Sequence, residues 1–168
     1  MTSNLAHLIS RATADLNPIA AHYSEQLPDP AAIAAQCDAQ DAKEVVATID
    51  SLFKEREEAE LSGEANGDEL DDYFRAMQRY ASLLPHLAGR FPNEVIFGLT
   101  SQARSTRLFV ADALCKAPIP QAIEPLEIAL GLETFDHIRR KLEEALVRCK
   151  ADQPPVKPWW RRLFGNGA

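Results

Sequence analysis

Two segments near the C-terminal end of the chain are alike, and this internal similarity constrains the fold more than any other feature of the sequence. Residues 107–114 (RLFVADAL) align with residues 139–146 (RRKLEEAL) at an offset of 32. Arg falls on Arg, and the closing Ala-Leu of one segment falls on the Ala-Leu of the other. A period of this size indicates helical repeats whose neighbours stack and share a core. The alternative is an ordinary helical bundle in which two helices match by chance.

The residues around these segments complete a pattern of helix, Pro-bearing turn, helix, Gly turn and helix over residues 101–149. The first helix ends with the sequence ADAL at residues 111–114, and the second, AIEPLEIAL at residues 122–130, ends at Gly131. This stretch resembles the short bacterial type of HEAT-like repeat. In that type, an Arg-rich helix ending Ala-x-Ala-Leu is followed by a helix of the form Ala-Ile-x-Pro-Leu-x-x-Ala-Leu.

The resemblance implies an all-α fold, a right-handed α-solenoid of HEAT-like helical repeats with about seven to nine helices. We expect one helical-repeat domain over residues 1–150, followed by a Pro-rich linker with a Trp/Arg tail over residues 151–168. Residues 69–89 and 93–100 are interpreted as a degenerate preceding repeat. Five apolar side chains are expected to fill the space between paired helices: Leu114, Ile123, Leu126, Leu130 and Leu146.

The composition is that of a globular protein that needs no cofactor to form a core. Hydrophobic residues make up 46% and charged residues 26% of the 168 residues. No apolar run approaches the roughly 18 residues of a membrane span, and the N-terminus lacks the pattern of a secretory signal. Cys37, Cys115 and Cys149 are widely spaced, which is typical of a reducing compartment. The four His residues form no metal-ligand motif. We therefore expect a cytoplasmic protein with no metal and no other cofactor.

The net charge of −7 is unevenly distributed along the chain. Residues 1–72 contain 16 acidic and four basic residues, whereas residues 73–168 contain nine acidic and 14 basic residues. In a solenoid, sequence order becomes spatial order, so one end of the molecule should be acidic. Such a field attracts cationic partners and repels nucleic acid.

A first candidate binding patch is the acidic cluster Glu64, Asp68, Glu69, Asp71 and Asp72. Its spacing does not match a calcium-binding loop. One interpretation is the solvated start of a helix, with Asp68 as the N-cap. The other is an electrostatic patch that steers and retains a basic protein.

A second candidate patch consists of Arg104, Arg107, Arg139 and Arg140. These residues either pair with acidic residues of the adjacent repeat, such as Asp112 or Asp136, or form a row that binds an acidic segment or a phosphate. A chain with a pI of about 5.1 is a poor candidate for binding the phosphate backbone of nucleic acid.

The tail sequence WWRRLF at residues 159–164 combines aromatic and basic side chains that are typical of interface anchors. Trp159 and Trp160 either fold back to cap the last repeat, bind a partner protein or contact a membrane surface. All three possibilities are compatible with the sequence.

The sequence as a whole favours a non-catalytic protein-binding module, an adaptor whose partner has a basic surface. A compact, acidic helical protein of this kind is similar in composition to bacterial immunity proteins, which inhibit a basic toxin domain. The alternative is a HEAT-like enzyme component or nucleic-acid-binding protein, of the lyase or glycosylase type. A glycosylase would require a basic concave face with aromatic residues and a catalytic Asp.

Overall fold

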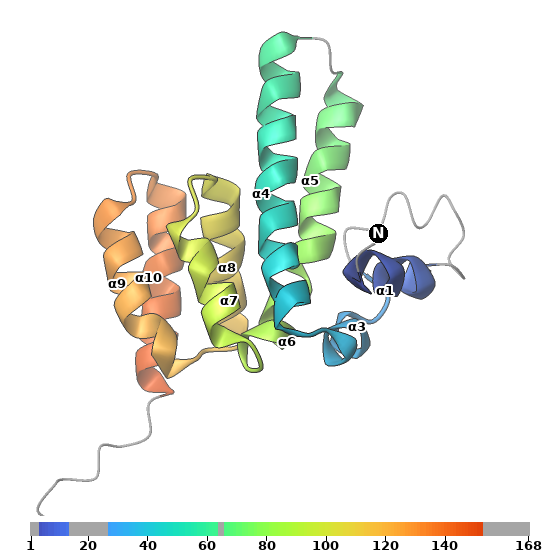
Figure 1. Ribbon diagram of the computed structural model, residues 1–168. Helices are drawn as coiled ribbons and strands as arrows, with labels where there is room; N and C mark the ends of the chain where they lie inside the picture. The colour runs from blue at the N-terminus through green and yellow to red at the C-terminus, as the bar shows by residue number, and fades with distance from the viewer. Residues whose placement is uncertain (1–3, 14–26, 64–65, 153–168) are drawn as a thin grey trace, which may run out of the picture.

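The computed structural model describes residues 4–13, 27–63 and 66–152, and all secondary structure in these ranges is helical (Figure 1). The prediction of an all-α fold is therefore confirmed for this part of the chain. The α-helices are α1 (Asn4–Thr13), α3 (Pro30–Gln36), α4 (Ala39–Ser62), α5 (Gly67–Ala81), α6 (Leu84–Ala88), α7 (Pro92–Phe97), α8 (Arg104–Lys116), α9 (Ile123–Leu132) and α10 (Asp136–Ala151). Two 3₁₀ turns, η1 (Gly98–Thr100) and η2 (Pro120–Ala122), precede α8 and α9.

Helices α4 and α5 form a long hairpin that projects beyond the other helices (Figure 1). Helix α4 begins with a capping box in which Asp38 and Asp41 each accept a hydrogen bond from the other's backbone N–H. It ends at Gly63, whose φ of 68° lies in the left-handed region that glycine adopts without strain. A second capping box, made by Asn66 and Glu69, opens α5. The N-cap of α5 is therefore Asn66, and the prediction of Asp68 was wrong by two positions.

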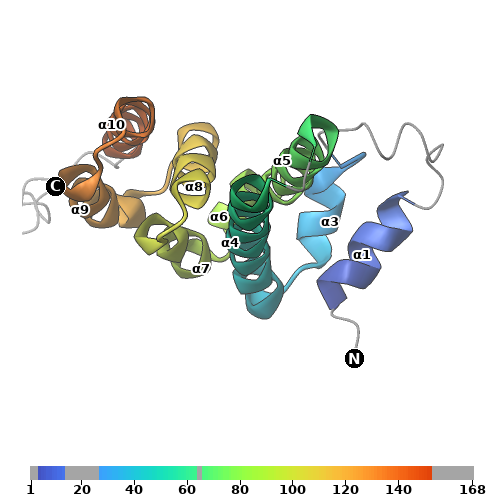
Figure 2. The same cartoon turned by 90° about the horizontal axis from the view of Figure 1, so that it is seen from above.

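Seen from above, the longer helices fall into two rows (Figure 2). Helices α4, α7 and α9 form one row, and α5, α8 and α10 form the other. Contacts between α4 and α7 and between α8 and α10 connect neighbours along the rows, while α9 contacts α10 across them. Helix α6 lies between α3 and α8, where it contacts both.

The two similar sequence segments lie in α8 and α10, which pack directly against each other. Val110 and Leu142, equivalent at the 32-residue offset, are both fully buried. Ala113 and Ala145 are also buried, and small side chains at these positions allow the two helices to approach closely. The offset seen in the sequence thus corresponds to two neighbouring helices with matched buried faces.

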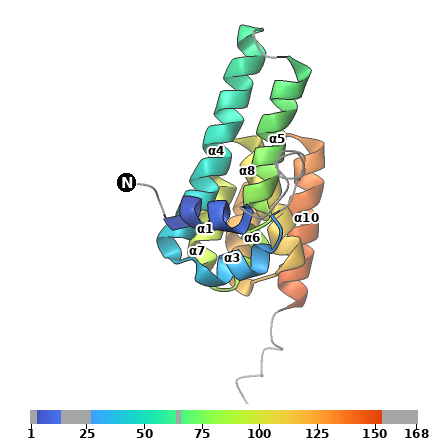
Figure 3. The same cartoon turned by 90° about the vertical axis from the view of Figure 1, so that its right-hand side faces the viewer.

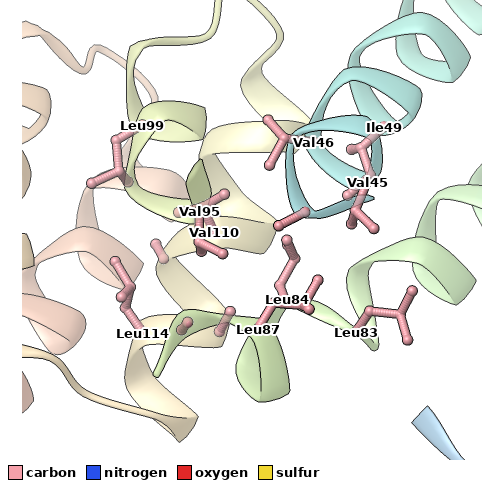
Figure 4. Packing of buried hydrophobic residues seen from close by; sticks show 14 of the residues in the cluster. Val45, Val46, Ile49, Leu83, Leu84, Leu87, Val95, Leu99, Val110 and Leu114 are labelled. Carbon is pink, nitrogen blue, oxygen red and sulfur yellow. The ribbon is translucent and has the colours of Figure 1, made fainter. Parts of the chain in front are cut away.

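The core is centred where α4, α6, α7 and α8 meet (Figure 4). Val46 of α4, Leu84 and Leu87 of α6, Val95 of α7 and Val110 of α8 converge there. Burying each such side chain fully contributes about 1.5–3 kcal/mol to stability. Because α4 belongs to the projecting hairpin and α6, α7 and α8 follow that hairpin in the sequence, this cluster connects the hairpin to the paired helices.

Gly98 is required for the close approach of helices in this core. A Cβ placed on Gly98 would lie 2.7 Å from Cγ2 of Val110 and 3.2 Å from Cγ1 of Val46. We expect Gly98→Ala to destabilise the protein by about 1–3 kcal/mol, because neither β-branched side chain can move without disturbing the packing. The measurement is the free energy of unfolding in urea.

Gly131→Ala is the matched control for this prediction. Gly131 lies in the last turn of α9, and a Cβ placed on it would have nothing within 4 Å. Replacing it should leave stability unchanged or raise it by up to about 1 kcal/mol, since alanine is the better helix former. Equal effects of the two substitutions would contradict the packing at Gly98.

Candidate functional site

An open apolar groove lies between α7 and α9, with a volume of about 700 Å³. Three of the large apolar side chains that line it are well exposed: Phe97 (70%), Ile128 (58%) and Leu132 (77%). The remaining lining residues are Asn93, Ile96, Leu99, Thr100, Ser101, Gln102, Arg107, Pro125, Ala129 and Glu133. Exposed apolar residues gathered in a concave surface are typical of a binding site.

The groove exists because α9 is apolar on two faces. Leu126 and Leu130 face the core, as predicted. Pro125, Ile128 and Leu132 recur at spacings of three and four and line the groove instead. Sequence analysis missed Ile128 and Leu132, although a signal was present. A ten-residue helix with apolar residues on nearly every side has more of them than one core face can cover.

A second hollow of about 440 Å³ lies between α4 and α7. It shares Asn93 and Phe97 with the first groove, so these two side chains lie between the hollows. The remaining lining residues are Lys43, Val46, Ala47, Asp50 and Glu94. The row α4, α7 and α9 therefore presents one continuous, hollowed surface, which we call the groove face.

A buried ion pair forms the polar end of the α7–α9 groove. The Nη2 of Arg107 lies 2.8 Å from Oε2 of Glu133, and Nε of Arg107 donates to the same oxygen at 2.8 Å. The side chains are only 17% and 1% exposed, respectively. Arg107 also donates through Nη1 to the carbonyl oxygen of Ser101 at 2.8 Å. The guanidinium thus bridges the loop before α8 and the loop before α10.

Ser101 and Glu133 occupy equivalent positions in the loops before α8 and α10. The side chain of each accepts hydrogen bonds from backbone N–H groups near the start of the helix that follows. Oε1 of Glu133 accepts hydrogen bonds from the backbone N–H groups of Thr134 and Phe135, at 2.9 and 3.0 Å. Oγ of Ser101 accepts from the N–H of Ala103 at 2.9 Å and donates to Asp50 of α4 at 2.7 Å. These side chains stabilise the starts of α10 and α8, whose N-cap residues make no side-chain cap themselves.

The environment of Glu133 lowers its pKa. Burial alone would raise the pKa of this carboxyl, because it disfavours the charged form. The hydrogen bond and charge of Arg107, together with the N–H groups of Phe135 and Thr134, outweigh that effect. The pKa of Glu133 therefore lies below its ordinary value, and the carboxylate is charged at neutral pH.

The four predicted arginines do not form a uniform row. Arg107 is committed to Glu133, so its partner is neither Asp112 nor Asp136. Within the described residues, Arg139, its sequence equivalent, makes only an exposed ion pair with Glu143 on its own helix, at 3.6 Å.

The other two predicted arginines have different surroundings again. The guanidinium of Arg104 lies over the rings of Phe53 and Phe135, with its central carbon 5.7 and 5.3 Å from the ring centroids. Arg140 is exposed and donates weakly to the carbonyl oxygen of Asp136, at 3.4 Å.

The predicted acidic cluster lies at the far end of the projecting hairpin (Figure 3). Asp68, Glu69 and Asp71 are exposed in the first turns of α5. Asp72 pairs with Arg75, and Glu64 lies outside the described residues. The facing end of α4 adds further exposed carboxylates, Glu55, Glu57, Glu58 and Glu60. The hairpin therefore carries acidic charge at the end that projects beyond the other helices (Figure 1).

Trp159 and Trp160 lie outside the described residues, so the possibilities for the tail stay predictions. Cys37, Cys115 and Cys149 are buried, free cysteines. In the described ranges no three His, Cys, Asp or Glu side chains are arranged to hold a metal ion. None of the helices in those ranges combines the length and apolar character that crossing a membrane requires.

Comparison of the chain with protein-family models, with curated proteins and with solved structures gave no significant match.

The two equivalent arginines should differ sharply in their effect on stability. Arg107→Ala should lower the free energy of unfolding by about 3–5 kcal/mol, because Glu133 would remain buried without its partner. Arg139→Ala, the matched control, should cost only about 0–1 kcal/mol, because its ion pair is exposed. Urea unfolding of both variants is the measurement, and similar losses would show that the buried pair is not specially important.

The lowered pKa of Glu133 also predicts a dependence on pH. The carboxylate stabilises the fold fully above the pKa of an unfolded glutamate, about 4.3. That contribution is lost as the pH falls through the lower pKa of the folded state. The stability difference between the wild type and Glu133→Gln should therefore shrink between roughly pH 5 and pH 3. Unfolding free energies measured across this range test it, and a constant difference would contradict it.

Proposed function

We propose that this chain is a non-catalytic protein-binding module that receives an apolar segment of its partner on the groove face. The observation that carries the proposal is the exposure of Phe97, Ile128 and Leu132 around one concave surface. Covering these side chains removes apolar area from water, which is the main source of affinity at protein interfaces.

The architecture proposed for the module is a short HEAT-like solenoid. Two rows of helices, with α8 and α10 matched at the 32-residue offset, support this assignment. In such an array one row supplies a recognition surface while the other closes the core. Here α4, α7 and α9 would be the recognition row.

Besides apolar contacts in the groove, we propose that the acidic charge of the α4–α5 hairpin contributes to recognition of the partner. The carboxylates at the end of the α4–α5 hairpin project away from the groove, where they can steer a basic partner before apolar contacts form. Inhibition of a basic toxin domain, as immunity proteins perform it, is the most specific form of this proposal. The Arg104, Arg107, Arg139 and Arg140 set contributes less, because Arg107 is already neutralised by Glu133.

The test is affinity capture from the native host with three versions of the full chain. The groove variant is Ile128→Gln with Leu132→Gln, which replaces two exposed apolar side chains. The matched control is Val147→Gln, which changes an equally exposed apolar residue (67%) on α10, outside the groove. We expect a protein identified by mass spectrometry to be retained by the wild type and the control, and to be reduced at least about tenfold with the groove variant.

The possible outcomes separate the proposed function from its alternatives. Equal capture by all three versions would contradict the groove as the binding surface. Retention of a nucleic acid or a small molecule in place of a protein would favour the glycosylase-type or lyase-type alternative. Loss of the captured protein at about 0.5 M salt would indicate that the acidic hairpin contributes electrostatically.

A further inference from the structure

We propose that the α7–α9 groove has an intramolecular ligand, the segment Trp159–Phe164 of this same chain, which a partner must displace. The proposal rests on the proposed function only in taking the groove as the binding surface. It adds regulation, because a groove filled by its own tail is closed to weak partners.

The chemistry of the segment matches that of the groove. Trp159, Trp160, Leu163 and Phe164 provide four large apolar side chains within six residues. The groove provides apolar walls and a volume of about 700 Å³, enough for more than one of them. Each tryptophan can bury about 150–250 Å² of surface, so two of them would cover much of the exposed apolar area.

The linker is long enough to carry the segment to the groove. Helix α10 ends at Ala151, and Lys150 in its last turn makes a 2.8 Å ion pair with Glu127 of α9. The chain therefore leaves α10 beside α9, the helix that forms one wall of the groove (Figure 1). Residues 153–158 contain three prolines and span about 19 Å when extended at 3.1 Å per residue. A helix with its side chains is about 10–12 Å across, so this length suffices to pass around α9.

The charges of the segment and of the helices that form the groove also favour docking of the tail in the groove. The segment contains two cations, Arg161 and Arg162, between its aromatic pair and its terminal Leu-Phe. Glu124, adjacent to Pro125 of the groove, and Glu94, which lines the neighbouring hollow, lie on the two helices that form the walls. Neither carboxylate makes an ion pair in the described part of the chain. Carboxylates on the two helices that form the groove walls complement two arginines that lie between apolar residues.

Because the tail segment is covalently linked to the rest of the chain, it can fill the groove even if its intrinsic affinity for the groove is low. A short linker gives the segment an effective concentration in the millimolar range at the groove. A partner in solution therefore binds only when its own contacts exceed those of the tail. The acidic hairpin can assist the exchange, because it attracts a basic partner without touching the occupied groove.

The experiment uses intrinsic fluorescence, because Trp159 and Trp160 are the two tryptophans of the chain. In the full-length protein without any partner, we expect blue-shifted emission and protection from acrylamide quenching, independent of protein concentration. Ile128→Gln with Leu132→Gln should shift the emission to longer wavelength and raise quenching toward the value of the unfolded chain. Val147→Gln should change neither property, and circular dichroism should show that both variants remain folded.

The other outcomes overturn the proposal. Emission typical of exposed tryptophan in the wild type would show that the tail is free. A response to Val147→Gln but not to the groove substitutions would place the tail on the outer face of α10. Blue-shifted emission that appears only at high concentration would show that a second copy is the occupant.

The same variants distinguish failure of this inference from failure of the proposed function. If the tail is docked, Trp159→Ala with Trp160→Ala should increase capture of the partner. A docked tail without any captured protein would overturn the proposed function alone. Groove-dependent capture with free tryptophans would overturn the inference alone.

Discussion

The arrangement of the paired helices depends on the buried contact between Arg107 and Glu133. One guanidinium holds the loop before α8 and, through Glu133, the loop before α10. Glu133 in turn satisfies the backbone N–H groups of Thr134 and Phe135, which would otherwise be left without acceptors near the start of α10. Such a pair carries a large desolvation cost, and its geometry must be correct to offset that cost. It therefore fixes the register between neighbouring helices, and with it the position of α9 relative to α7.

That register has a functional consequence, because the groove is the space left between α7 and α9. The core closes around α4, α6, α7 and α8, while Ile128 and Leu132 are directed away from it. Apolar residues that the core does not cover become the recognition surface of the proposed module. The acidic end of the α4–α5 hairpin lies apart from this surface, so attraction of a partner and apolar docking are assigned to different parts of the molecule.

Local patterns in the sequence were reliable where neighbouring residues determine the outcome. The buried faces of α8 and α10 follow from periodicity, and Val110 and Leu142 lie where the 32-residue offset places them.

Prediction failed where one local signal competes with another. Asn66 caps α5 because Glu69 completes a capping box with it, whereas Asp68 offered the same chemistry two residues later. Arg107 and Arg139 looked equivalent, but only Arg107 has a buried carboxylate from a following loop beside it.

The sequence alone determined that the described chain is helical and which faces of α8 and α10 are buried. These properties depend on hydrophobic spacing, on proline and glycine and on capping residues, all of which act over a few positions. Only the tertiary structure decided that Glu133 is the partner of Arg107, that Gly98 must remain small and that Ile128 and Leu132 stay exposed. Each of these depends on which distant helix lies alongside, a choice made by packing and desolvation over the whole molecule.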